Sequence, residues 1–159
     1  MLTQDRLKYL LHYDPETGDW TWLNPPNHNT RLKGRLAGNR RHDGYLRIRI
    51  DGGLFYSSHL ACLYMTGKLP DKEMDHIDRN PANDKWSNLR QATSSQNKYN
   101  RALNSGWRGV YRSGSNWWAM VGRENYLGLF PTLEEALAAR DAEAKRLGGD
   151  FAILNGERT

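Results

Sequence analysis

The clearest fold signal in this chain is the stretch GYLRIRIDGGLFYSSH at residues 44–59. Over residues 46–50, aliphatic side chains alternate with Arg47 and Arg49, which is the period-two pattern of a half-buried strand. The residues that follow, Asp51-Gly52-Gly53, are typical of the turn in a β-hairpin. We therefore expect an antiparallel hairpin with one apolar face and one face that carries arginines.

Short helices and strands flank this hairpin. Leucines recur at helical spacing after Thr3, so a short helix is predicted over residues 3–13. The Asp14-Pro15 turn in DPETGDWTWL leads into a strand. The segment HLACLYMTG predicts a buried helix that ends at Gly67. Helices and strands in this mixed order indicate an α+β fold.

Positive charge is concentrated before residue 105. The formal net charge of +5 arises from 16 Lys and Arg against 11 Asp and Glu in residues 1–104, while residues 105–159 hold seven basic and seven acidic residues. Residues 31–50 alone hold seven basic residues and one acid. Such clusters attract polyanions, nucleic acid above all, although a solvated basic face is the alternative. The expected phosphate contacts in this region are Arg40, Arg41, Arg47 and Arg49.

The apolar composition and the cysteine count bear on the compartment. No run approaches the ~18 to 20 apolar residues of a membrane span, and residues 1–18 lack the apolar core of a signal peptide. Cys62 is the single cysteine, which excludes an internal disulfide and a multi-cysteine zinc site. We therefore expect a soluble, cytoplasmic protein.

The strongest chemical signal is a polar stretch at residues 73–100, EMDHIDRNPANDKWSNLRQATSSQNKYN. Asp75 and His76 stand together in a strand-like segment. Residues 78–88 have no apolar period and are expected to form a loop. Thr93-Ser94-Ser95-Gln96 fits a capping box, which predicts a helix that continues to about residue 101.

Side chains of this stretch suit metal-assisted hydrolysis of a phosphodiester. Asp75 and Asn97 offer hard oxygen ligands, which Mg²⁺ and Mn²⁺ prefer. His76 would project from the opposite face of its strand, where it could take a proton from a water that attacks phosphorus. An ordinary polar pair at a strand end is the alternative interpretation of Asp75 and His76. We expect Mg²⁺ or Mn²⁺ as cofactor, and no small-molecule cofactor.

The stretch resembles the HNH, or ββα-metal, endonuclease motif of phage and intron-encoded homing enzymes, and the similarity extends over about residues 10–100. The resemblance implies that His76 is the general base and that Asp75 and Asn97 are metal ligands. It also implies that Asn88 fixes the loop through backbone hydrogen bonds. Asn97 stands where many relatives have a second His, and this H-N-N pattern implies nicking of double-stranded DNA. For a phage protein, the compartment would be the host-cell cytoplasm.

Residues 105–159 predict a small second module. WRGVYR, NWWAMVG and YLGLF are strand-like, and TLEEALAARDAEAKRLGG has a Thr132 cap with Glu135 as its capping partner. We therefore expect a ββα-metal nuclease domain at residues 1–104, followed by a three-stranded antiparallel sheet packed on one helix. A short linker is expected at residues 101–107.

This module resembles the plant APETALA-type, or ethylene-response-factor (ERF), DNA-binding domain. The similar residues include Arg108-Gly109-Val110, Trp117, Ala119, Tyr126-Leu127-Gly128 and Phe130. In that family the sheet enters the major groove, so the resemblance implies sequence recognition by this sheet. Met120 and Glu124 depart from the family pattern, which leaves the target sequence open. The implied DNA-contacting residues are Arg108, Arg112, Trp118, Arg123 and Tyr126.

Several assignments have alternatives. Arg90 is expected to contact phosphate or to support the loop, and both readings stand. His59 is expected to cap or pack, with a phosphate contact as the alternative. A non-catalytic DNA-binding protein that keeps the fold is the alternative function, and RNA is an alternative substrate. A monomer is favoured.

Overall fold

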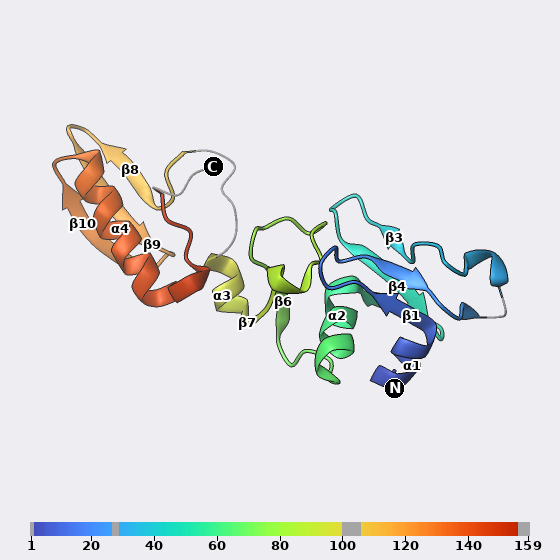
Figure 1. Ribbon diagram of the computed structural model, residues 1–159. Helices are drawn as coiled ribbons and strands as arrows, with labels where there is room; N and C mark the ends of the chain where they lie inside the picture. Colours follow the sequence, from blue (N-terminus) through green and yellow to red (C-terminus); the bar gives the residue numbers. More distant parts are fainter. Residues whose placement is uncertain (1, 27–28, 100–105, 156–159) are drawn as a thin grey trace. The chain divides into compact units, whose positions relative to one another are not determined.

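The computed structural model describes residues 2–26, 29–99 and 106–155 (Figure 1). The chain forms two compact units, Met1–Thr93 and Ser94–Thr159. The expected domain boundary after residue 104, and most of the expected linker, lie outside the described residues, so this boundary stays a prediction.

The first unit begins with helix α1 (Gln4–Leu10), which Thr3 caps by accepting a hydrogen bond from the backbone N–H of Arg6 at 3.2 Å. The helix predicted to residue 13 is wrong over its last three residues. These residues form strand β1 (Leu11–Tyr13), which pairs antiparallel with strand β2 (Trp20–Trp22). The first and third residues of β1 are buried, so strand pairing and burial outweigh the helical spacing of the leucines.

The predicted hairpin is confirmed. One antiparallel sheet contains strands β3 (Asn39–Arg40), β4 (Leu46–Ile50) and β5 (Gly53–Tyr56). Ile48 and Ile50 are buried, whereas Arg49 is exposed, so the two faces differ as expected. Asp51 takes a left-handed φ of 47° in the turn, a conformation that Asp tolerates better than most residues.

Helix α2 (Ser57–Thr66) packs against the aromatic residues of β1 and β2. It ends at Gly67, as predicted, because this residue takes the left-handed conformation with φ 79°. The indole Nε1 of Trp20 donates to Ser57 Oγ at 2.9 Å, which satisfies a buried donor at the start of the helix. The core of the first unit includes Leu7, Leu10, Leu11, Tyr13, Trp20, Ile48, Ile50, Leu60 and Leu63.

Two strands carry the polar stretch identified in the sequence. Strands β6 (Glu73–His76) and β7 (Leu89–Ala92) pair antiparallel, and the 3-10 helix η3 (Trp86–Asn88) closes the loop between them. Helix α3 (Ser94–Tyr99) follows in the chain and belongs to the second unit. The elements thus follow each other in the expected order ββα, and the predicted continuation of α3 to residue 101 lies outside the described residues.

The second unit has the architecture that the sequence predicts. It contains strands β8 (Val110–Ser113), β9 (Asn116–Val121) and β10 (Asn125–Phe130), helix α4 (Leu133–Gly148) and the 3-10 helix η4 (Gly149–Phe151). The strands form an antiparallel sheet in the order β10-β9-β8. Figure 1 shows α4 lying across one face of this sheet, where Val110, Ala119 and Ala136 are buried.

Polar contacts stabilise the start of α4 and the segment before β8. Thr132 caps α4 by accepting from the backbone N–H of Glu135 at 3.2 Å, as predicted. The buried amide of Asn155 accepts from the backbone N–H of Arg108 at 2.8 Å and donates to Asp141 at 3.0 Å. These bonds tie the segment before β8 to α4. Across the described segments of both units, none of the helices has the length and apolar composition needed to cross a bilayer.

Candidate active site and nucleic-acid interface

Strand β6 holds two of the predicted site residues in buried positions. Asp75 lies opposite Arg90 on β7, and Arg90 Nε donates to Asp75 Oδ2 at 2.9 Å. This ion pair with a carboxylate is neither of the two roles expected for Arg90, so a phosphate contact and support of the loop both stay predictions. The oxygens of a carboxylate are hard ligands of the kind that Mg²⁺ and Mn²⁺ prefer.

His76, the predicted base, is also buried. Its Nε2 lies 3.0 Å from Oδ1 of Asp84, and both side chains are only 4% exposed. The ring also meets the ring of Tyr45 edge-on, with centroids 5.8 Å apart. The imidazole is thus bonded to Asp84 through Nε2 and packs against the ring of Tyr45.

Asn88 lies in a hydrogen-bond network that shapes the loop between β6 and β7. Its Oδ1 accepts from the backbone N–H of Asp78 at 3.0 Å, and its Nδ2 donates to Asp78 Oδ1 and to the carbonyl oxygen of Asn83 at 2.9 and 2.8 Å. Asn83 Nδ2 donates to the other carboxylate oxygen of Asp78 at 2.6 Å. This geometry is that of a residue that fixes the loop, as the resemblance implies.

The network also changes the acidity of Asp78. Burial disfavours its charge, but hydrogen bonds from Asn83, from the backbone of Asn80 and from Asn88 outweigh this effect, so the pKa of Asp78 lies below its ordinary value. Both oxygens of the carboxylate are engaged inside the loop. In the described structure, the carboxylate of Asp78 therefore stabilises the loop between β6 and β7.

Asn97 lies on helix α3, at a half-buried position in the second unit. Its participation in one site with Asp75 and His76 stays a prediction. His59 lies on α2, and its ring packs on that of Tyr56 with centroids 5.8 Å apart. Burial lowers the pKa of His59, which favours the neutral form and a packing role.

Two residues of the first unit were missed in the sequence. Asp84 belongs to a loop rich in polar residues, where nothing local distinguishes it from the others. Tyr13 donates its hydroxyl to the carbonyl oxygen of Asp84 at 2.6 Å, across 71 positions of sequence. A contact over this separation has no local signal, since it depends on how the β1–β2 hairpin packs on the loop.

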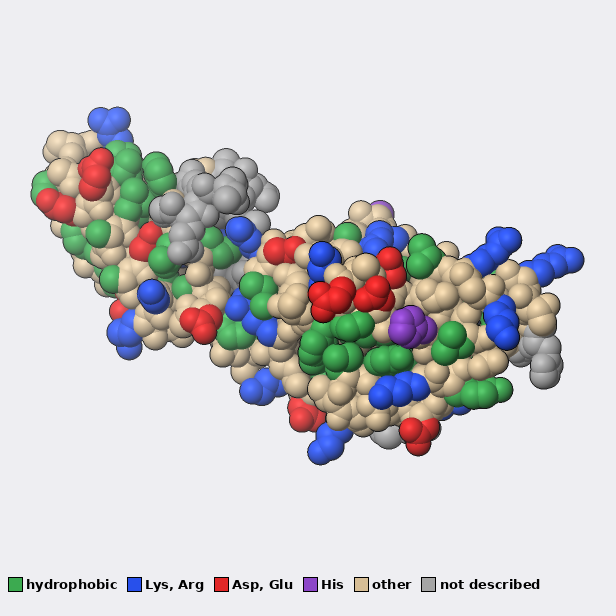
Figure 2. All heavy atoms as spheres, viewed as in Figure 1, with side chains coloured by type: hydrophobic (Ala, Val, Ile, Leu, Met, Phe, Trp, Pro, Cys, Tyr) green, Lys and Arg blue, Asp and Glu red, His purple; other side chains and the backbone are tan. Residues whose placement is uncertain are grey.

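The four arginines of the predicted basic region have different partners. Arg40 donates to the carbonyl oxygen of Gly44 at 2.9 Å, Arg41 pairs with Asp43 at 3.0 Å, and Arg49 contacts the carbonyl oxygen of Gly52 at 3.3 Å. Arg47 is half-buried on β4. Figure 2 shows Lys and Arg side chains projecting from the end of this unit that holds the 3-10 helix η2 (Thr30–Leu32). Among the residues that the structure describes, Arg41 is the one of these four that forms an ion pair with an acid.

The sheet of the second unit has one exposed aromatic face. The rings of Tyr111 and Trp118 stack with centroids 4.4 Å apart, and Trp118 lies 6.4 Å from the ring of Tyr126, which is 60% exposed. Trp118 and Tyr126 therefore share the face opposite α4. We call Tyr111, Trp118 and Tyr126 the aromatic face.

The arginines predicted to accompany these rings are distributed differently. Arg112 pairs across the sheet with Trp117, which packs on the core beneath α4, so strand alternation places Arg112 on the helix side. Arg123 is exposed in the turn between β9 and β10, and Arg108 precedes β8 at a half-buried position. Arg112 therefore does not share a face with Trp118.

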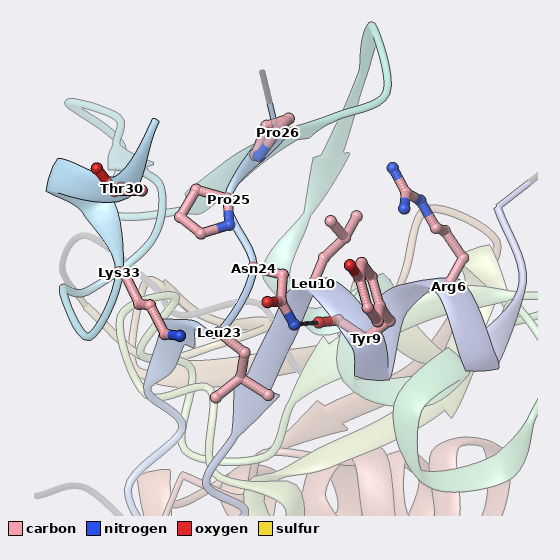
Figure 3. Close-up of a pocket in the computed structure, with 9 residues that line it drawn as sticks. All are labelled: Arg6, Tyr9, Leu10, Leu23, Asn24, Pro25, Pro26, Thr30 and Lys33. Atoms are coloured by element: carbon pink, nitrogen blue, oxygen red, sulfur yellow. Dashed lines mark hydrogen bonds between the residues drawn. The ribbon is translucent and has the colours of Figure 1, made fainter. Parts of the chain in front are cut away.

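A pocket of about 330 Å³ lies elsewhere in the first unit (Figure 3). It is lined by α1, by the end of β2 and by the segment that follows. Asn24 Nδ2, at its wall, donates to the carbonyl oxygen of Tyr9 at 2.7 Å. The lining residues are Arg6, Tyr9, Leu10, Leu23, Asn24, Pro25, Pro26, Thr30 and Lys33, so none of the predicted catalytic residues contributes to it.

Comparison with known proteins bears on the stretch that contains β6, β7 and α3. Residues 55–99 match the model of the HNH endonuclease family. An uncharacterized HNH endonuclease of Acanthamoeba polyphaga mimivirus is 39% identical over 98 residues, which cover 58% of this chain and 52% of that protein. The chain thus spans about half the length of this curated relative. Asp75, His76, Asn88 and Asn97 all fall within the matched family segment.

Proposed function

We propose that this chain, whose residues 55–99 match the HNH endonuclease family, is a metal-dependent DNA endonuclease that hydrolyses phosphodiester bonds. The observation that carries the proposal is the buried His76 on β6, next to the buried Asp75, inside the matched segment. Two adjacent buried polar side chains in a matched nuclease segment favour a catalytic role over an ordinary polar pair at a strand end.

In this reaction His76 takes a proton from the water whose oxygen attacks phosphorus. The phosphorus–oxygen bond to the leaving group breaks, that oxygen takes a proton from solvent water, and His76 returns its proton to solvent. His76 must be neutral to accept the proton, and its buried position among Asp84 and Tyr45 keeps the ring in one orientation. Proton transfer of this kind typically contributes about 10²- to 10⁴-fold in rate.

Asp75 and Asn97 are the residues proposed to hold the cation. Both present oxygen atoms, which fits a hard ion such as Mg²⁺ or Mn²⁺. Among the described residues, no group of three or more His, Cys, Asp or Glu side chains is arranged to hold a metal ion. Two protein ligands would leave coordination positions for phosphate and water oxygens. When bound, the cation supplies positive charge that neutralises the leaving oxygen. Arg90 orients the Asp75 carboxylate through its 2.9 Å bond.

The finer assignments follow the same proposal. Asn97 in place of a second His supports a homing-type enzyme that nicks one strand of double-stranded DNA. The second unit, similar in sequence to ERF domains, would serve as the recognition module, and its aromatic face supports this role. The basic residues of the first unit would contribute electrostatic binding to DNA phosphates that does not depend on the DNA sequence.

The test is incubation of the protein with supercoiled plasmid, with and without Mg²⁺ or Mn²⁺, followed by separation of supercoiled, nicked and linear forms. We expect metal-dependent loss of the supercoiled form and accumulation of the nicked form. Single-stranded RNA in a parallel reaction tests the alternative substrate. Tight binding to DNA without cleavage under any of these metals would support the alternative of a non-catalytic DNA-binding protein.

A further inference from the structure

We propose that Asp84 is a positioning residue for His76: its carboxylate accepts the Nε2–H of the imidazole and leaves Nδ1 as the nitrogen that takes the proton. The expected effect of Asp84 on cleavage rests on the proposed nuclease function. The tautomer of His76 is a property of the folded protein and does not depend on that function. The two atoms, Nε2 and Oδ1, are 3.0 Å apart, and both side chains are buried.

The chemistry of the two groups decides which nitrogen carries hydrogen. An ionised carboxylate only accepts hydrogen bonds, so a neutral imidazole that bonds it must present an N–H at Nε2. A neutral imidazole has one donor nitrogen and one acceptor nitrogen. The acceptor is therefore Nδ1, and the bond to Asp84 selects the tautomer as well as the direction of the ring.

The position of Asp84 is itself fixed from the first hairpin. The hydroxyl of Tyr13 donates to the carbonyl oxygen of Asp84 at 2.6 Å, and the backbone N–H of Trp86 donates to the carbonyl oxygen of Pro15 at 3.0 Å. Gly18 has a φ of 82°, and a Cβ at this position would lie 2.5 Å from the carbonyl carbon of Asp84. The turn between β1 and β2 thus lies in direct contact with the backbone that carries the carboxylate.

The pair is poorly explained by stability alone. Oδ2 of Asp84 is buried and has no hydrogen-bond partner among the residues that the structure describes. A buried carboxylate with an unused oxygen is unfavourable for folding, because desolvation is only partly compensated. A structural role would be filled as well by an amide or an apolar side chain, whereas selection of a tautomer needs a group that only accepts.

The first experiment reads the tautomer without reference to cleavage. In the full-length protein labelled with ¹⁵N at histidine, long-range ¹H–¹⁵N correlation spectra distinguish Nε2–H from Nδ1–H imidazole. The signals of His76 are assigned by their loss in His76→Ala. We expect the Nε2–H form in the wild type and a mixture of forms in Asp84→Asn, because the amide can present either its oxygen or its NH₂ group. An Nδ1–H form in the wild type, or an unchanged spectrum in Asp84→Asn, would overturn the proposal.

The second experiment measures the consequence. Asp84→Asn keeps the shape of the side chain, so we expect the melting temperature and the DNA dissociation constant to stay near those of the wild type, while the single-turnover cleavage rate falls by about 10²- to 10⁴-fold. Asp71→Asn is the matched control, since Asp71 is exposed and lies before β6. Asp84→Ala, examined in the same way, should show the same loss of rate.

The two experiments separate two kinds of failure. If the wild-type protein cleaves no DNA, the proposed function is wrong, while the ¹⁵N spectra still decide the tautomer. If the wild type cleaves and both Asp84 variants cleave at its rate, the positioning role is wrong although the nuclease function stands.

Discussion

Three carboxylates of the first unit lie within ten residues of one another, and each has different hydrogen-bond partners. Asp75 accepts from the guanidinium of Arg90, whereas Asp84 bonds the imidazole of His76. Asp78 is bonded entirely within its own loop. Residue type alone therefore does not assign a role in this stretch, because the three Asp side chains bond a guanidinium, an imidazole and the groups of a loop.

His76 should be required for cleavage and dispensable for binding. We expect His76→Ala to lower the single-turnover rate on plasmid DNA by about 10²- to 10⁴-fold, because the proton of the attacking water loses its acceptor. The dissociation constant for DNA, measured without metal, should change little, since a buried side chain offers little contact surface. His12→Ala, on the exposed side of β1, is the control. Wild-type cleavage by His76→Ala would mean that another group is the base.

At the scale of elements, the β4–β5 hairpin could be predicted because its signals are local in the sequence. The end of helix α1 could not be predicted, because it depends on the pairing of β1 with β2. The turn at Asp51-Gly52 and the alternation in β4 are both encoded within ten residues, and the structure confirms them. The helix α1 was predicted too long because Leu11 continues its leucine spacing, and only pairing with β2 ends it. The same limit applies to the candidate site: the sequence predicts the motif residues, but it does not predict the contact between Asp84 and His76.

The loop between β6 and β7 should lose stability in acid. The pKa of Asp78 lies below its ordinary value of 3.8, so the stability that its carboxylate contributes is fully present above about pH 4 and is lost as the pH falls through the folded pKa. We expect Asp78→Asn to lower the free energy of unfolding at pH 7 by about 0.5 to 1 kcal/mol, a modest amount because the group is largely exposed. The difference from the wild type should narrow near pH 3.

Chemical denaturation at both pH values measures this effect. Asp71→Asn serves as the control, because Asp71 is an exposed residue before β6. If the difference between Asp78→Asn and the wild type were the same at pH 3 and pH 7, the charge of Asp78 would not be what stabilises the loop.

Strand β4 should contribute to DNA affinity through its arginines. Each phosphate contact adds about 0.9 to the slope of log affinity against log salt concentration. Replacing Arg47 and Arg49 together by Ala should therefore flatten the slope by up to about 2. Arg146→Ala is a suitable control, because Arg146 pairs with Glu143 at 2.6 Å on α4. An unchanged slope in the double variant would indicate that β4 does not contact phosphate.

At the scale of the whole molecule, cleavage and recognition should be separable in the full-length protein. The proposed catalytic residues fall within residues 75–97, whereas the aromatic face belongs to the sheet β8–β10. If this sheet reads base edges, Arg108→Ala should weaken binding to the preferred duplex by about 1 to 3 kcal/mol and binding to random duplex much less. At saturating DNA its single-turnover cleavage rate should equal that of the wild type.

Arg112 makes the comparison sharper, since it belongs to the same sheet but lies on the side of α4. If the aromatic face is the binding surface, Arg112→Ala should cost less specificity than Arg108→Ala, and Trp118→Ala should cost more than Arg112→Ala. Footprints and dissociation constants on both duplexes measure these differences. Equal, small effects of all three variants would mean that the second unit does not select the site through this sheet, and the preference would then have to come from the first unit.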